Sequence, residues 1–300
     1  MKKFDLEKLV GPIEWQREGK GFIQCPAEDL HTTPTKLKDT ILYMDNVPTI
    51  FCLHNQCKAV VKEANVALRA ALRGKSWHPK ELTEEQKEAR ERRWDLERQA
   101  RRLAKHKDWV HEKYEWPVEA IVSDSLPIAD PWQQFLSIWP EDDIMWCGEP
   151  NYSGQFAHAE YFRPIKTWRS MPNPPHPFVC GTSFKAGTYS RTKDCIEDRR
   201  FLIVECDDLD PDPIKNKDMS GSVLKWVNNM DEWNLRCIVD SGNKSIHGWF
   251  NYPSAKEEEW ARIVLPALCV DTATLRCTQP VRAAGIKRDN GNEQKLIWIR

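Results

Sequence analysis

Two acidic side chains follow a run of apolar residues in the segment FLIVECDDLD, residues 201–210. A continuous apolar run is typical of a buried strand. Glu205 and Asp207 are two positions apart, so in extended backbone they share one face at the end of that strand. Neighbouring carboxylates repel each other unless a cation lies between them, and hard oxygen ligands favour Mg²⁺ or Mn²⁺. The pattern predicts a divalent-cation site. The alternative is an acidic loop at the start of a helix, with Asp208 and Asp210 as turn residues.

A hydroxyl and an imidazole follow a turn in the segment VDSGNKSIHGWF, residues 239–250. Ser245 and His247 share one face of the strand that leaves the turn, and Lys244 stands beside them. These groups next to a carboxylate pair would suit a triphosphate held against metal ions. A single histidine in a strand is most often a packed core residue. The turn is not a phosphate-binding P-loop, because Asn243 separates the glycine from the lysine and a strand follows where a helix should begin.

A third carboxylate ends the apolar run in ALCVDTATLR, residues 267–276. The segment QPVRAAGIKRDNG follows, and its Arg282 and Arg288 could hold phosphates through paired hydrogen bonds. Asp271 could also be a plain turn or helix-capping residue. The functional interpretation depends on the whole set of acidic, hydroxyl, imidazole and arginine groups.

A separate group of soft ligands lies near the amino terminus. Zinc prefers four ligands in a tetrahedron, usually two from each of two short loops. Cys25 with His31 and Cys52 with Cys57 provide two such pairs, and we expect a structural zinc site with no open coordination position. His54 is the competing fourth ligand, because it lies two residues after Cys52. The alternative is that these residues are reduced thiols and imidazoles without a metal.

The chain divides into three parts by composition. Residues 1–75 mix short apolar runs with turn signals and are predicted to form a zinc-ribbon-like module, in which TILYMD and PTIFC are strands. Residues 76–116 are predicted to be a charged helical linker, with one long helix over 83–115. Because its ten Lys and Arg nearly balance nine Asp and Glu, a solvated connecting helix is favoured over a nucleic-acid-binding arm.

Residues 117–300 are predicted to form an α+β or α/β domain, because strand-like runs alternate with helical ones. The predicted strands are RRFLIVEC, LRCIVD, SIHGWF and KLIWIR, and the predicted helices are GSVLKWVNNM and SAKEEEWARIVLPAL. KLIWIR ends the sequence abruptly, and we expect a fragment whose parent continues beyond it.

The composition excludes some classes of protein. The net charge is −1, so any nucleic-acid binding must come from local patches. The start lacks the apolar core of a signal peptide, and no stretch approaches the roughly 20 apolar residues of a membrane span. We therefore expect a cytoplasmic protein without a membrane partner. The seven cysteines from Cys147 onward stand singly and are expected to be small buried apolar residues.

The order of these motifs resembles the archaeo-eukaryotic primase superfamily, and especially the primase domains of phage and plasmid replication proteins. VECDD resembles the acidic first motif, SGNKSIHGWF the Ser-x-His second motif, and VDTATLR with QPVRAAG the third. The segments CPAEDLHTT and PTIFCLHNQC look like the zinc ribbon that precedes some such cores. The resemblance covers about residues 19–75 and 117–300, and its second motif is the most specific. The first motif is Glu-x-Asp here where many relatives have Asp-x-Asp, which alters its reach toward a metal.

The resemblance implies an α+β protein with an RRM-like primase catalytic core, an amino-terminal zinc ribbon and a long connecting helix. It implies primer synthesis on single-stranded DNA from nucleoside triphosphates by two-metal nucleotidyl transfer. A helicase domain or protein would be a further partner. The implied roles are metal binding by Glu205, Asp207 and Asp271, and triphosphate binding by Lys244, Ser245 and His247, with Arg282 and Arg288 on phosphate or template. The alternative is a non-catalytic nucleic-acid-binding or replication-assembly protein that keeps a primase-like fold.

Overall fold

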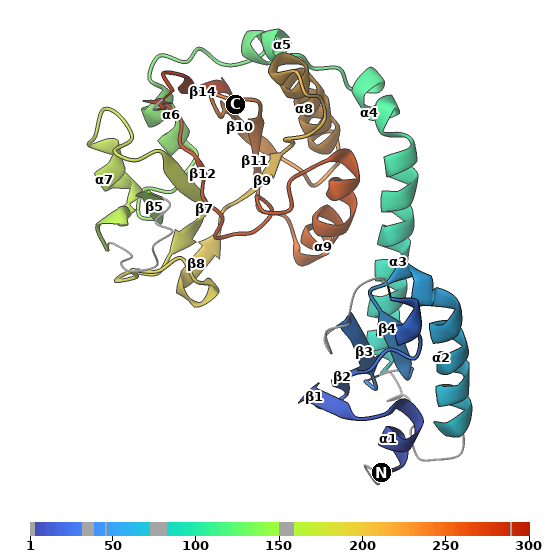
Figure 1. The fold of residues 1–300 in the computed structure, drawn as a ribbon. Helices are drawn as coiled ribbons and strands as arrows, with labels where there is room; N and C mark the ends of the chain where they lie inside the picture. Colours follow the sequence, from blue (N-terminus) through green and yellow to red (C-terminus); the bar gives the residue numbers. More distant parts are fainter. Residues whose placement is uncertain (1–3, 32–38, 46, 73–82, 150–158, 289) are drawn as a thin grey trace. The chain divides into compact units, whose positions relative to one another are not determined.

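Strands that pair antiparallel in three sheets, together with helices, make this an α+β protein in its computed structural model (Figure 1). The structure describes residues 4–31, 39–45, 47–72, 83–149, 159–288 and 290–300. The chain forms two compact units, residues 1–89 and 90–300. No helix in the described ranges is both long enough and apolar enough to cross a membrane.

The unit of residues 1–89 is built on a four-stranded sheet in the order β1-β2-β3-β4. Its elements are α1 (Phe4–Val10), β1 (Ile13–Arg17), β2 (Lys20–Ile23), the 3₁₀ turn η1 (Glu28–Leu30), β3 (Thr40–Tyr43), β4 (Thr49–Cys52), the 3₁₀ turn η3 (Asn55–Cys57) and α2 (Lys58–Leu72). The segments TILYMD and PTIFC are strands β3 and β4, as predicted. The Asn65 side chain of α2 accepts a hydrogen bond from the amide of Ile50 (2.7 Å) and donates one to its carbonyl (2.9 Å) at the edge of β4.

The predicted single helix over 83–115 is wrong in one respect, because the structure divides it. Helix α3 (Glu84–Lys105) ends before His106, whose φ of −124° and ψ of 25° depart from helical values, and α4 (Lys107–Lys113) follows. Val110 is fully buried, whereas Trp94 and Trp109 are exposed. The charged stretch therefore contributes to the core of the larger unit as well as to its surface.

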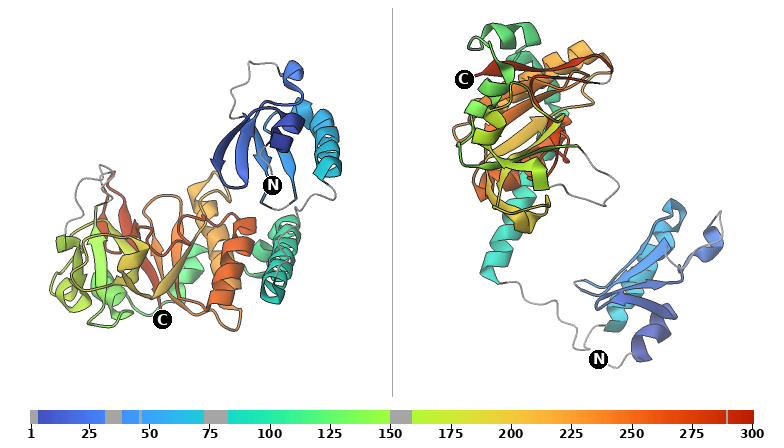
Figure 2. Two further views of the ribbon diagram at one scale, coloured as in Figure 1. Left: turned by 90° about the horizontal axis from the view of Figure 1, so that it is seen from below. Right: turned by 90° about the vertical axis from the view of Figure 1, so that its left-hand side faces the viewer.

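The larger unit contains a sheet in the order β13-β14-β10-β11-β9. Its strands are β9 (Phe201–Glu205), β10 (Leu235–Asp240), β11 (Ile246–Asn251), β13 (Ile286–Lys287) and β14 (Glu293–Ile299). Four of them match the four predicted strands. The helices α8 (Pro213–Asn228) and α9 (Ala255–Val264) pack against one face of this sheet (Figures 1 and 2). Both overlap predicted helices, although α8 begins eight residues before the predicted start at Gly221.

A second sheet, in the order β12-β7-β5-β6 with β8 also paired to β7, belongs to the same unit. It comprises β5 (Ile144–Gly148), β6 (Phe162–Pro164), β7 (Phe178–Phe184), β8 (Ile196–Arg199) and β12 (Val281–Arg282), and the helices before and within it are α5 (Val118–Ser123), α6 (Pro131–Ser137) and α7 (Ile165–Arg169). Its residues share a buried core with the other face of the first sheet, including Ile203, Val239 and Trp249. The first sheet is therefore covered on both faces, as the continuous apolar runs predict.

The single cysteines follow the expected pattern in part. Cys147, Cys180, Cys206, Cys237 and Cys277 are buried, whereas Cys195 and Cys269 are partly exposed. All ten cysteines of the chain are free thiols in this structure.

Candidate functional site

Strand pairing places the first and second polar motifs side by side. Glu205, the last residue of β9, lies directly opposite His247 of β11. Glu205 Oε1 accepts a hydrogen bond from Ser245 Oγ (2.6 Å) and lies 2.9 Å from His247 Nε2. Because a carboxylate can only accept, the Nε2 atom carries the hydrogen in this contact. The other ring nitrogen, Nδ1, is buried and has no hydrogen-bond partner in the described part of the chain.

The two carboxyl groups of the first motif differ in their electrostatics. Burial opposes the charge on Glu205, but the attraction of His247 and the hydrogen bonds from His247 and Ser245 outweigh burial and lower its pKa from 4.5 to about 2. For Asp207, burial and the neighbouring Glu205 charge raise the pKa above its usual 3.8. Glu205 is therefore the more firmly ionised member of the pair.

Asp271 reaches the same place through a short backbone pairing. Cys206 and Val270 form an isolated antiparallel bridge, and the amide of Asp271 donates to the carbonyl of Glu205 at 2.8 Å. The Asp271 side chain accepts a hydrogen bond from the amide of Ala273 at 2.8 Å. The third predicted carboxylate is thus on the same side of the sheet as the first two, although it also caps its own turn.

The turn between β10 and β11 carries the predicted lysine. Lys244 Nζ lies 2.8 Å from Asp208 Oδ1, so the lysine is paired with the acidic segment that follows β9. Arg288 Nη1 donates to the carbonyl of Ser241 at 3.1 Å, and the Ser241 hydroxyl donates to the carbonyl of Ser245 at 2.8 Å. Arg288 therefore contacts the backbone of this turn from the segment before β14.

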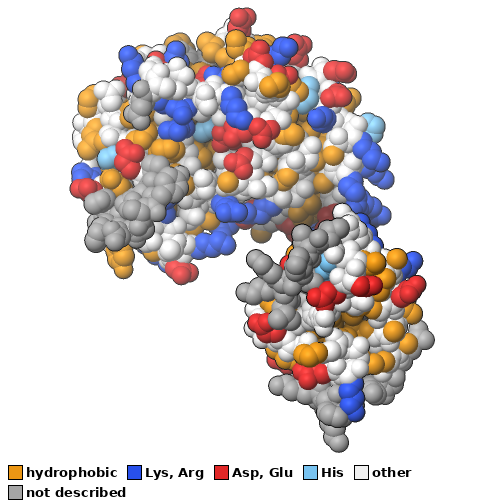
Figure 3. All heavy atoms as spheres, viewed as in Figure 1, with side chains coloured by type: hydrophobic (Ala, Val, Ile, Leu, Met, Phe, Trp, Pro, Cys, Tyr) orange, Lys and Arg blue, Asp and Glu red, His pale blue; other side chains and the backbone are white. Residues whose placement is uncertain are grey.

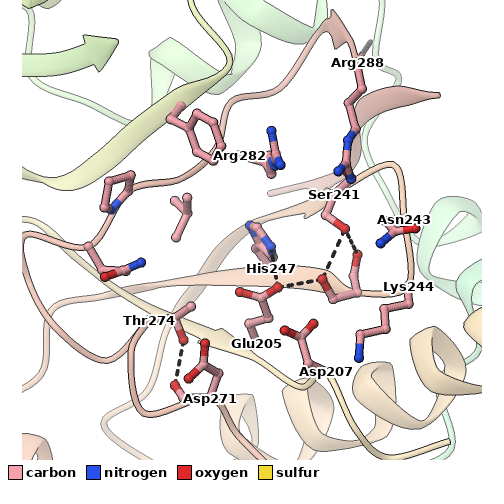
Figure 4. A pocket seen from close by; sticks show the side chains of 15 residues that line it. Glu205, Asp207, Ser241, Asn243, Lys244, His247, Asp271, Thr274, Arg282 and Arg288 are labelled. Atoms are coloured by element: carbon pink, nitrogen blue, oxygen red, sulfur yellow. Dashed lines mark hydrogen bonds and ion pairs between the residues drawn. The ribbon is translucent and has the colours of Figure 1, made fainter. Parts of the chain in front are cut away.

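These groups line one cavity of about 230 Å³ on the side of the first sheet that faces β7 and β12. All eight residues predicted for cation and nucleotide binding are among its walls: Glu205, Asp207, Lys244, Ser245, His247, Asp271, Arg282 and Arg288. Figure 4 shows the three carboxyl groups at one end of the cavity, with Arg282 and Arg288 at the other. The Arg282 guanidinium lies over the Phe178 ring, 4.1 Å from its centroid.

Several walls of the cavity were not predicted from the sequence: Phe178, Ser241, Asn243, Thr274, Gln279, Pro280 and Val281. Ser241 and Asn243 lie within the turn already identified, so its composition offered a signal for them. Phe178 follows a proline-rich loop and Thr274 stands in a short turn. Neither stretch has a pattern that marks a site.

The oxygen donors suit Mg²⁺ or Mn²⁺ by their chemistry. Within the described ranges, however, the carboxylates do not gather into a group of three ligand atoms close enough to share an ion; the cysteine and histidine group does. Glu205 Oε1 is occupied by two internal contacts. The three carboxylates line the same cavity, but their oxygen atoms would have to move closer together to hold one cation.

The amino-terminal ligands do converge. One ligand atom from each of Cys25, His31, Cys52 and Cys57 lies within 4.8 Å of the others. The loop after β2 and the turn η1 position the first pair, and the end of β4 and the turn η3 position the second. This cluster could hold a structural metal such as zinc, because three thiols and one imidazole are a usual zinc ligand set.

His54 lies close to the cluster but outside this group of four. Its Nδ1 is 3.5 Å from Cys52 Sγ, and its ring lies 4.1 Å, centroid to centroid, from the ring of His31. His31 Nε2 is 2.9 Å from Cys57 Sγ and 3.6 Å from Cys52 Sγ. His31 therefore approaches two thiols, which favours it over His54 as the fourth ligand.

The two thiols of the second pair have opposite electrostatics. Burial opposes ionisation of Cys52, but the nearby Thr40 hydroxyl and the hydrogen-bonding contacts of His54 lower its pKa to about 6. Burial and the neighbouring thiols raise the pKa of Cys57 to about 12. A bound cation would favour the thiolate form of both residues.

Charged side chains are unevenly distributed over the larger unit. In the space-filling view, acidic side chains gather in the middle of the visible face, with Lys and Arg side chains around them (Figure 3). A local arrangement of this kind is compatible with a net charge of only −1.

The chain was compared with family models, with curated proteins and with solved structures, and nothing matches it. Its function is therefore inferred from the site itself.

Proposed function

We propose that this chain is a primase-polymerase that makes short primers on single-stranded DNA by nucleotidyl transfer. The observation that carries the proposal is the cavity in which Glu205, Asp207 and Asp271 lie across from Arg282 and Arg288. Carboxylates at one end suit divalent cations, and guanidinium groups at the other suit phosphates. An RRM-like core and a place in the archaeo-eukaryotic primase superfamily are parts of the same proposal.

Each side chain then has a role that its contacts support. Divalent ions, when bound, would activate a primer hydroxyl and neutralise triphosphate charge, with Glu205, Asp207 and Asp271 as their ligands. Ser245 orients the Glu205 carboxylate by donating to it. The His247 ring keeps Nε2 on Glu205, and its Nδ1, which has no hydrogen-bond partner among the described residues, would be the atom turned toward a phosphate group.

The positively charged side chains of the cavity would bind the rest of the substrate. The Lys244 side chain lines the cavity and would exchange its ion pair with Asp208 for one with a phosphate group. Arg282 and Arg288 would contact the triphosphate or the template backbone. The Cys/His cluster would bind structural zinc, and its unit would help to capture template. We place the protein in the cytoplasm, with a helicase domain or protein as a partner.

The test is a primer-synthesis reaction with circular single-stranded DNA, labelled ribo- or deoxynucleoside triphosphates, and Mg²⁺ or Mn²⁺. We expect short labelled products that require template and metal. Absence of products with both metals and both kinds of nucleotide would refute the proposal.

Two observations favour a second candidate, a non-catalytic nucleic-acid-binding or replication-assembly protein. Glu205 is engaged by Ser245 and His247, and the three carboxylates are not gathered as tightly as the cysteine and histidine group. This candidate predicts that the protein binds single-stranded DNA without making products under any metal.

A further inference from the structure

A single buried carboxamide lies between the two backbone segments that carry the site. Asn216, near the start of α8, is fully buried. Its Nδ2 donates to the carbonyls of Cys206 (2.9 Å) and Lys244 (2.7 Å). Its Oδ1 accepts from the amides of Leu209 (2.9 Å) and Asp210 (3.3 Å). A carboxamide has two hydrogens to donate and two lone pairs to accept with, so its capacity is fully used.

The two carbonyls are placed at the centres of the two polar motifs. Cys206 stands between Glu205 and Asp207, and Lys244 directly precedes Ser245. One nitrogen atom therefore ties the acidic segment to the turn that would bind phosphate. The strands β9 and β11 pair with each other next to these segments. Among the hydrogen bonds of the described residues, no other side chain contacts the backbone of both segments: Ser220 reaches only the Cys206 carbonyl and Arg288 only that of Ser241.

The next residue of α8 supports the same turn from its other end. Lys217 Nζ lies 2.9 and 2.8 Å from the two carboxylate oxygens of Asp240, and both side chains are mostly buried. Asp240 Oδ1 in turn accepts from the amide of Gly242 at 2.8 Å. The start of α8 thus contacts this connection near both of its ends, at Asp240 and at Lys244.

We propose that Asn216 is a positioning residue that fixes the spacing between the carboxylates of the first motif and the Lys244–His247 segment. The joining of the two segments rests on the contacts above, and its meaning for nucleotide and metal binding rests on the proposed function. Two substitutions distinguish the effect of losing the hydrogen-bond donors from the effect of losing side-chain volume. Asn216→Asp keeps the shape but puts an acceptor against two carbonyls, whereas Asn216→Ser is smaller and keeps one donor.

The matched control is an asparagine at the opposite end of the same helix. Asn228 Oδ1 accepts from the amide of Leu235 at 3.0 Å, and Asn228 does not line the cavity. Asn228→Ala removes an accepting contact to a backbone amide, like the one that Asn216 Oδ1 makes with Leu209. It should therefore lower stability without changing the site.

Amide hydrogen exchange in the whole protein tests the inference independently of activity. In both Asn216 variants, we expect exchange in residues 206–210 and 241–245 to accelerate together, by about tenfold or more. In Asn228→Ala those amides should exchange as in the parent. If only one of the two segments accelerates, or if the control accelerates both equally, Asn216 does not join them and the inference is overturned.

Kinetic measurements then test whether the spacing between the two segments matters for metal and nucleotide binding. The Mn²⁺ concentration for half-maximal synthesis and the nucleotide KM should rise about tenfold in Asn216→Ser and stay unchanged in Asn228→Ala. A merely structural role would reduce the amount of active protein without moving either constant, and that result would also count against the inference. An inactive parent protein would instead refute the proposed function, and exchange would still decide the role of Asn216.

Discussion

The amide of Asp271 donates a 2.8 Å hydrogen bond to the carbonyl of Glu205. This contact brings together two acidic residues that are 66 positions apart in the sequence. It fixes the backbone of Asp271, and the amide of Ala273 holds the Asp271 carboxylate at 2.8 Å. Asp207, whose pKa is raised by its surroundings, is the carboxyl group whose substitution should change chemistry with little change in fold.

Asp207→Ala tests the proposed chemistry most directly. Asp207 is not needed for the pairing of β9, and its raised pKa shows that its charge is not stabilised by the fold. Loss of a metal ligand should reduce primer synthesis at least about 100-fold, while the zinc content and thermal unfolding stay as in the parent. Asp231→Ala, which removes an exposed carboxylate outside the cavity, is the control. Synthesis at the parental rate by Asp207→Ala would exclude this residue from catalysis.

His31→Ala and His54→Ala should separate the two candidate zinc ligands. We expect one zinc ion per chain in the parent and in His54→Ala, because His31 is the imidazole that approaches two thiols. His31→Ala should lose most of the zinc and destabilise residues 1–89. Elemental analysis with amide exchange measures both effects. Zinc loss in His54→Ala alone would reverse the assignment.

The pH dependence of stability should reveal the buried Glu205. Its pKa is lowered from 4.5 to about 2, so it stabilises the folded state above pH 4.5 and this contribution is lost as the pH falls toward 2. The full loss corresponds to about 3 kcal/mol. The raised pKa of Asp207 acts in the opposite direction and reduces the net change.

Glu205→Gln is the matched variant for this measurement, because glutamine keeps an acceptor for Ser245 and His247. The free energy of unfolding of the parent should fall more steeply between pH 4.5 and 2 than that of the variant. Tryptophan fluorescence follows the relevant unit, since 12 of the 14 tryptophans lie in residues 90–300. Parallel pH profiles would mean that the Glu205 charge is not stabilised by the fold.

Gly242→Ala should distort the turn that carries Lys244. Gly242 has a φ of +71°, and an added Cβ would meet the carbonyl oxygen of Glu293 at 2.7 Å. Gly187→Ala is the control, because its φ is +76° but nothing lies within 4 Å of the added atom. We expect a loss of about 1 kcal/mol in the control from the backbone conformation alone, and a clearly larger loss for Gly242→Ala, measured by chemical unfolding. Equal losses would show that the turn can move away from β14.

Apolar runs predicted four of the five strands of the first sheet, because that sheet is covered on both faces. Strands β9, β10, β11 and β14 all coincide with apolar runs. The second sheet was missed. Strands β6, β8 and β12 are only two to four residues long and carry charged side chains, and β7 begins at the end of the proline-rich segment 171–178. Helix α2 was also missed, because short apolar runs in residues 1–75 are equally compatible with strands.

The candidate site was predictable where a side chain's place follows from its own strand. Ser245, His247 and Glu205 follow from a period of two and the ends of their strands. The position of Asp271 depends on a single bridge between Cys206 and Val270, which no local pattern encodes. Asn216 is harder still, because an asparagine early in a helix is usually solvated and only tertiary packing makes it buried and fully bonded.

The carboxamide of Asn65 lies at the outer edge of the four-stranded sheet of residues 1–89. It satisfies both the amide and the carbonyl of Ile50 on β4, the last strand in the order. An unpaired edge strand is a template on which another chain can add a strand and begin aggregation. By occupying the middle of that edge with a side chain of its own helix, the protein blocks such growth at this register.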